Sequence, residues 1–256
     1  MKAMFLRLAP LLALAACDGG GEAGRVSIPV AVDGSGIGDS TTELGWTVKL
    51  TAARVAIADL ELTVEGEAHA SLLRTVGDWL VGTAWAHPGH QAGGEVTGEL
   101  PGDFVLDFVG GAGAVLGEAT ALEGAYHGAN FAFRRATAAD GLAAGDPLLG
   151  HTAWLEGTAT KGDVTVPFTA ALDAPDGTRL VGAELDVTIG GGGAPTLRLA
   201  LLTTDPEEGD SLFQKVDFGA AAPGTALDIR PGDSLHNVLQ RTLVTHDHWR
   251  VTAEED

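Results

Sequence analysis

Glycine is spread along most of the chain, with thirty-seven glycines in 256 residues. Each costs about 1 kcal/mol relative to alanine in a helix interior, so long helices are disfavoured. Between the glycines, short segments alternate apolar and polar side chains, the two-residue period of a half-buried strand. The sequence therefore predicts an all-β fold, a β-sandwich or jelly-roll-like single domain. The predicted strands include residues 26–32, 46–50, 54–64, 104–108, 130–133, 152–160, 163–172, 184–189, 196–202 and 242–252.

The first residues predict an export signal. Lys2 and Arg7 precede an apolar run at residues 8–16, which ends in Leu14-Ala15-Ala16-Cys17. This end resembles the lipobox of bacterial lipoproteins, and Cys17 is the only cysteine in the chain. The resemblance implies a signal peptide at residues 1–16 and a lipid on Cys17. The alternative is an ordinary secretory signal with a chance cysteine.

The segment after the lipobox is rich in glycine and predicts a flexible tether at residues 17–24, followed by the β domain at residues 25–256. The apolar run of the signal is too short to span a bilayer, which takes about twenty residues. We therefore expect a lipid anchor to hold the domain in the cell envelope, on the periplasmic or outer surface of a bacterial membrane. With one cysteine there is no internal disulfide.

The charge of the chain excludes one class of partner. Removing Lys2 and Arg7 from the fifteen basic residues leaves thirteen against thirty-five acidic ones, a formal charge near −22. Binding to phosphate groups needs clustered lysine and arginine, so no nucleic-acid partner is expected. An acidic surface attracts cations; alternatively, it serves only to keep a tethered protein soluble.

Two histidine pairs carry the main functional hypothesis. His87 and His90 flank a Pro-Gly turn that can aim both rings at one point. His246 and His248, if they lie on a strand, project to the same face about 7 Å apart, and Asp247 then points to the opposite face. We expect the two pairs to meet around one metal ion. The alternative for each pair is exposed imidazoles without a ligand.

Other side chains are candidates to complete such a site. His127 and His151 each have a glycine neighbour, which lets the backbone approach a ligand closely. Glu95 and Glu99 share one face if their segment is a strand, where they could orient a histidine as hydrogen-bond acceptors. The acidic stretch at residues 205–208 lacks the regular spacing of a calcium loop.

The available donor groups limit the metal. Without a second cysteine the ligands are imidazole and carboxylate, which suit copper(II) or zinc(II). The lipobox, the β-rich body with residues 46–64, and histidine pairs beside Trp85 and Trp249 resemble metal-binding bacterial lipoproteins, in particular the periplasmic copper-binding proteins associated with methanobactin. That resemblance implies a copper site made of histidines. It carries no individual ligand over to this chain.

The sequence contains none of the nucleophile motifs Gly-x-Ser-x-Gly and Ser-x-x-Lys, no phosphate-binding loop and no His-Glu-x-x-His zinc motif. We therefore expect a non-enzymatic, lipid-anchored metal-binding protein, acting as a copper or zinc carrier, scavenger or sensor. One alternative is a structural or adhesive envelope lipoprotein without a metal. A second alternative is a metal-dependent hydrolase, with Glu95 or Glu99 as its general base.

Overall fold

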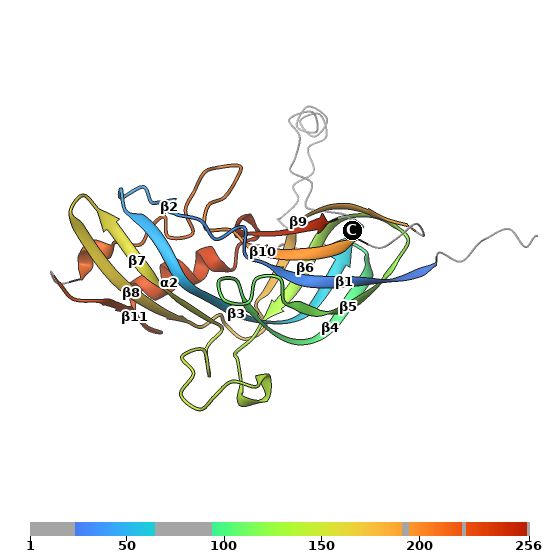
Figure 1. The fold of residues 1–256 in the computed structure, drawn as a ribbon, viewed down its shortest axis with the longest axis horizontal. Helices are drawn as coiled ribbons and strands as arrows, with labels where there is room; N and C mark the ends of the chain where they lie inside the picture. The colour runs from blue at the N-terminus through green and yellow to red at the C-terminus, as the bar shows by residue number, and fades with distance from the viewer. Residues whose placement is uncertain (1–23, 65–93, 191–194, 222–223, 255–256) are drawn as a thin grey trace, which may run out of the picture.

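The protein is described by a computed structural model over residues 24–64, 94–190, 195–221 and 224–254. Strands dominate, and the α-helix α2 lies near the end of the chain (Figure 1). The all-β single-domain prediction is confirmed. The elements are β1 (Arg25–Asp33), β2 (Ser40–Thr41), β3 (Thr47–Thr63), β4 (Val96–Asp107), β5 (Val115–Leu122), β6 (Gly124–Phe133), η1 (Ala138–Asp140), β7 (Ala153–Lys161), β8 (Val164–Leu172), β9 (Arg179–Ile189), β10 (Thr196–Leu201), η2 (Phe218–Ala220), β11 (Leu227–Ile229), α2 (Ser234–Leu243), η3 (His246–His248) and β12 (Trp249–Glu254).

The strands form one mixed sheet that closes on itself. The order β3-β4-β5-β1-β10-β12-β9-β6 returns to β3, because β6 pairs with the second half of β3. Most neighbours are antiparallel, while β1 with β10 and β12 with β9 are parallel. We call this part the closed sheet. Closure leaves its strands with hydrogen-bonded neighbours on both sides, which removes open edges.

Strand β3 links the closed sheet to an extension formed by β7, β8 and β11. Its first half pairs with β7, which continues to β8 and β11. The sequence predicts two strands in this region, at residues 46–50 and 54–64, whereas β3 is continuous over seventeen residues. Register shifts absorb the change of partner. Helix α2 packs along the extension against β8 (Figure 1).

One hydrophobic core runs through both parts. Inside the closed sheet, the Trp249 ring packs edge-on against Phe131 with ring centroids 4.9 Å apart, and against Phe108 with ring centroids 5.8 Å apart. Under the extension, Phe168 packs against Phe213 and Phe218. These side chains belong to a single cluster of buried residues. The continuous core explains why the chain forms one domain.

The predicted strand at residues 242–252 is only partly correct. Helix α2 extends to Leu243, η3 follows, and β12 begins at Trp249. The α-helix has its apolar side chains at helical spacing, with Leu239 and Leu243 buried. Among the described residues, no helix is long and apolar enough to cross a membrane.

Candidate functional site

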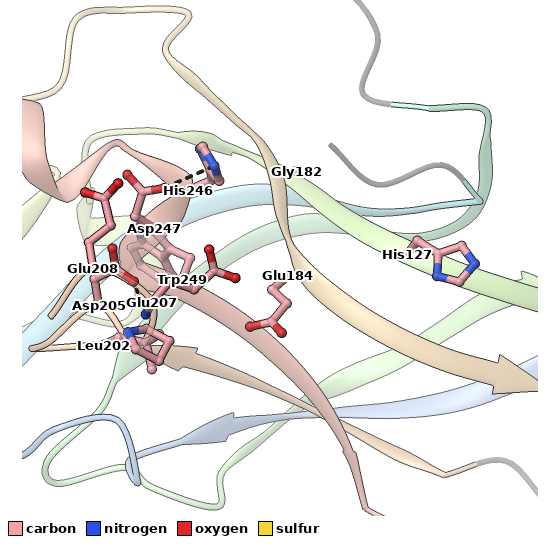
Figure 2. A pocket seen from close by; sticks show the side chains of 11 residues that line it. His127, Gly182, Glu184, Leu202, Asp205, Glu207, Glu208, His246, Asp247 and Trp249 are labelled. Carbon is pink, nitrogen blue, oxygen red and sulfur yellow. Dashed lines mark hydrogen bonds and ion pairs between the residues drawn. The ribbon is translucent and has the colours of Figure 1, made fainter. Parts of the chain in front are cut away.

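A hollow with many acidic side chains opens on the outer side of the closed sheet. It forms where β6 and β9 meet the segment after β10 and the turn η3, and its volume is about 250 Å³ (Figure 2). We call it the acidic hollow. Its chemistry comes from two imidazoles and five carboxylates: His127, His246, Glu184, Asp205, Glu207, Glu208 and Asp247.

The acidic stretch at residues 205–208 forms one wall of the hollow. Asp205 is buried, and its carboxylate accepts a hydrogen bond of 2.8 Å from the backbone N–H of Glu207. The backbone closes the turn, since the N–H of Asp205 donates to the Asp210 carbonyl and that of Gly209 donates to the Asp205 carbonyl. This turn holds Glu207 and Glu208 beside the hollow, where Figure 2 shows their carboxylates on the side of His246 and Asp247.

The turn η3 supplies His246 and Asp247. Nε2 of His246 lies 3.1 Å from Oδ1 of Asp247, and both residues line the acidic hollow. The sequence places Asp247 on the face opposite His246, and this is wrong. The expectation assumes a strand, whereas a 3₁₀ turn has about three residues per turn and changes which side chains are neighbours.

His248 faces a different way. Its ring is buried, and Nδ1 donates a hydrogen bond of 2.9 Å to the Leu202 carbonyl. Burial lowers the pKa of this imidazole, which favours its neutral form. His248 lines a neighbouring hollow and His246 does not, so the predicted shared face of His246 and His248 is wrong.

His127 reaches the acidic hollow from the other side. It lies on β6, half exposed, with Nδ1 at 3.4 Å from the Asp186 carboxylate of β9. In Figure 2 it stands apart from the carboxylates around His246, with Glu184 between the two groups. Four of the six histidines predicted as metal ligands lie in the described residues, and of these His127 and His246 line the hollow.

The segment that carries the first histidine pair begins beside His127. Thr63, at the end of β3, pairs with Gly128, and the backbone N–H of Val64 donates to the Glu95 carbonyl. The chain therefore leaves the sheet and returns to it next to this side of the acidic hollow. His87 and His90 themselves lie outside the described residues, as does Cys17. Their predicted roles stay predictions.

The remaining predicted site residues lie elsewhere. His151 donates from Nδ1 to the Asp173 carboxylate at 2.8 Å and does not line the acidic hollow. Glu95 and Glu99 line a separate shallow hollow together with Arg25. No histidine of the described segments lines that hollow, so the structure gives their predicted acceptor role no described partner.

The electrostatics of the acidic hollow follow from its lack of basic partners. Within the described ranges, none of its five carboxylates forms an ion pair with arginine or lysine. Neighbouring carboxylates repel one another and attract cations. In those same ranges, no three histidine, aspartate or glutamate side chains are close enough to form a complete metal site. The hollow offers a cation-attracting surface with imidazole nitrogens at two sides.

Sequence reasoning missed most of the acids of the hollow. Glu184 has the alternating pattern of an ordinary outward strand residue, and only the pairing of β9 with β12 brings it beside the turn η3. Residues 205–208 are noticeable in the sequence as an acidic turn, but nothing local to them indicates histidine neighbours. The order of strands in the sheet brings these acids close to the histidines.

No protein-family model, curated protein or solved structure shows a detectable match to this chain.

Proposed function

We propose that the protein is a lipid-anchored, extracytoplasmic metal-binding protein that carries, scavenges or senses copper or zinc without catalysing a reaction. The observation that carries the proposal is the acidic hollow, in which His127 and His246, 119 positions apart in the chain, line one surface with five carboxylates. Imidazole nitrogen and carboxylate oxygen are ligands that copper(II) and zinc(II) accept.

The described ends of the segment that carries the first histidine pair lie near the same site. The segment with His87 and His90 is bounded by Val64 and Glu95, which pair with each other next to β6. It therefore starts and ends close to His127. Histidines on this segment would add nitrogen ligands to a hollow whose described side chains do not complete a metal site by themselves.

The export signal and the lipobox support the location. A lipid on Cys17 would hold the domain at a membrane surface through a tether of residues 17–24, with the acidic domain exposed to metal ions outside the cytoplasm. A Cys17→Ser variant should move from the membrane fraction to the soluble fraction of the envelope. A variant that stays with the membrane would contradict lipid anchoring but not metal binding.

Metal binding is tested on the full chain in detergent. Elemental analysis and titration with copper(II) and zinc(II) should give one tight equivalent, which His246→Ala weakens at least tenfold and His127→Ala weakens less. The matched control is His151→Ala, because His151 lies away from the hollow in a pair with Asp173. Since imidazole must lose its proton to bind, affinity should fall below about pH 6.5.

The outcomes separate the alternatives. Loss of binding in His246→Ala but not in His151→Ala supports the acidic hollow as the site. Equal loss in both variants, or binding that stays constant down to pH 5, contradicts a histidine site in this hollow. No tight binding by the unmodified chain leaves a structural or adhesive lipoprotein.

A further inference from the structure

His236 is a buried histidine that joins helix α2 to the sheet. Only 5% of it is exposed. Its Nε2 atom accepts a hydrogen bond of 3.0 Å from the backbone N–H of Asp173, which follows β8 directly. Its Nδ1 atom lies 3.1 Å from Oδ1 of Asn237, its neighbour on the helix. Both ring nitrogens are therefore in use.

These two contacts define the protonation state of the ring. A backbone N–H only donates, so Nε2 of His236 accepts and carries no proton. A neutral imidazole then has its proton on Nδ1, which donates to Asn237. A second proton on Nε2 would point at the Asp173 N–H. The bond from sheet to helix exists only while the ring is neutral.

The charges around His236 do not offset such a proton. Asp173 lies across the contact, and its carboxylate already accepts from Arg135 at 2.8 Å and from His151 at 2.8 Å. On the side of the helix, Asp233 accepts from the Arg230 backbone and Arg241 donates to the Asn237 carbonyl. The charged and titratable groups near His236 on both packed elements are thus Asp173, Arg135, His151, Asp233, Arg230 and Arg241.

We propose that His236 is an acid-sensitive latch: helix α2 is docked on the β8–β9 connection while the ring is neutral, and protonation of Nε2 releases it. Release of the helix uncovers its apolar face, which includes Leu239 and Leu243. The backbone pairing of β7 with β8 involves no imidazole, so acid should loosen the helix and leave these strands paired. The latch does not depend on metal binding.

Hydrogen exchange of the full chain tests the latch. Exchange is followed by mass spectrometry between pH 7.5 and 5, with rates corrected for the intrinsic pH dependence using an unstructured peptide of the same sequence. Because the released helix binds one proton more, its opening equilibrium should rise as the pH falls from 7.5 to 5, by at most about tenfold per pH unit. Peptides from β7 should keep their protection.

His236→Gln retains a neutral side chain and removes the titration, so its α2 protection should not change with pH. His151→Gln is the matched control and should keep the pH response. The proposal is overturned if α2 and β7 peptides lose protection together, or if His236→Gln keeps the response. Should that variant fail to fold, nitrogen-15 spectra of the histidine rings in the unmodified chain decide. An Nε2 of His236 that is protonated at pH 7.5 contradicts the latch.

Discussion

Acidic side chains gather in two regions of the molecule, which differ in whether the acids have arginine partners. In residues 134–152, between β6 and β7, the acids are paired: Asp140 with Arg134 and Asp146 with Arg54. In the acidic hollow, within the described residues, no carboxylate pairs with an arginine or lysine, and Asp247 has only His246. Burial alone does not explain the difference, because Asp205 in the hollow is 5% exposed and the Asp140 side chain in the paired region is 7% exposed.

The difference shows which acids build the fold and which do not. The charged side chains of residues 134–152 satisfy backbone groups in and beside this connection: Arg134 donates to the Ile57 carbonyl of β3, and Asp140 accepts from the N–H of Thr137. In the hollow, Asp205 accepts a backbone hydrogen bond within its own turn, but the neighbouring carboxylates repel one another. Groups kept at a cost to stability are typical of binding sites, which supports a cationic ligand at the acidic hollow.

Asp140→Ala, in the paired region, should cause the largest loss of stability. Asp140 and Arg134 are 7% and 15% exposed, and removal of the carboxylate leaves the guanidinium without its main counter-charge. We expect a loss of about 3 kcal/mol in the free energy of unfolding, measured by chemical denaturation.

The same arginine offers an internal control. Arg134 also lies 3.3 Å from Asp103, which is 67% exposed. Asp103→Ala should cost less than about 1 kcal/mol, because exposed ion pairs contribute little. Equal losses in the two variants would contradict the structural role given to the buried pair.

The second largest effect on stability should come from loss of the Asp146 carboxylate charge, by low pH or by substitution. Hydrogen bonds from Arg134 and Arg54 lower the pKa of Asp140 and Asp146, respectively. A carboxyl whose folded pKa is depressed stabilises the fold fully above its unfolded value of about 3.9, and this contribution is lost as the pH falls through the folded pKa. Asp146→Asn should therefore lose about 1.5 kcal/mol at pH 7.

The unfolding free energy of the Asp146→Asn variant should also depend less on pH below about pH 4 than that of the unmodified chain. Denaturation curves at pH 7, 5 and 3 measure this. A constant difference between the two proteins at all three values would show that the carboxylate acts through packing and not through its charge.

The sequence predicts the all-β class well because alternation and glycine are local signals. The segments at residues 26–32, 152–160 and 163–172 fall on β1, β7 and β8. The order of strands is not local. Nothing near β6 in the sequence indicates that it closes the sheet onto β3, since that pairing joins residues about seventy positions apart.

The site was predictable only in part for the same reason. Histidines are visible in any sequence, and His127 and His246 do line one hollow. A strand over residues 242–252 predicts His246 and His248 on the same face, whereas this segment contains the end of α2, the turn η3 and the start of β12. Val244 and Thr245, with β-branched side chains, favour that interpretation, but Leu243 packs in the core as the last residue of α2.

The smallest effect on stability should come from the unpaired acids. Glu207→Gln/Glu208→Gln removes two like charges from the wall of the acidic hollow, so the unfolding free energy should stay the same or rise by a few tenths of a kcal/mol. The affinity for zinc(II) or copper(II) should fall about fivefold to tenfold, because less negative charge faces the ion. Glu156→Gln on β7, outside the hollow, is the matched control for net charge.

Opposite changes in stability and affinity are what distinguish this wall from the paired region. A structural role for Glu207 and Glu208 would make the double variant less stable, as Asp140→Ala is expected to be. A general effect of net charge would lower the affinity of Glu156→Gln by a similar factor for each charge removed. If these acids serve a ligand, the double variant should bind the metal more weakly without becoming less stable. The reason is that the repulsion between the acids is relieved by the bound cation and not by a neighbouring side chain.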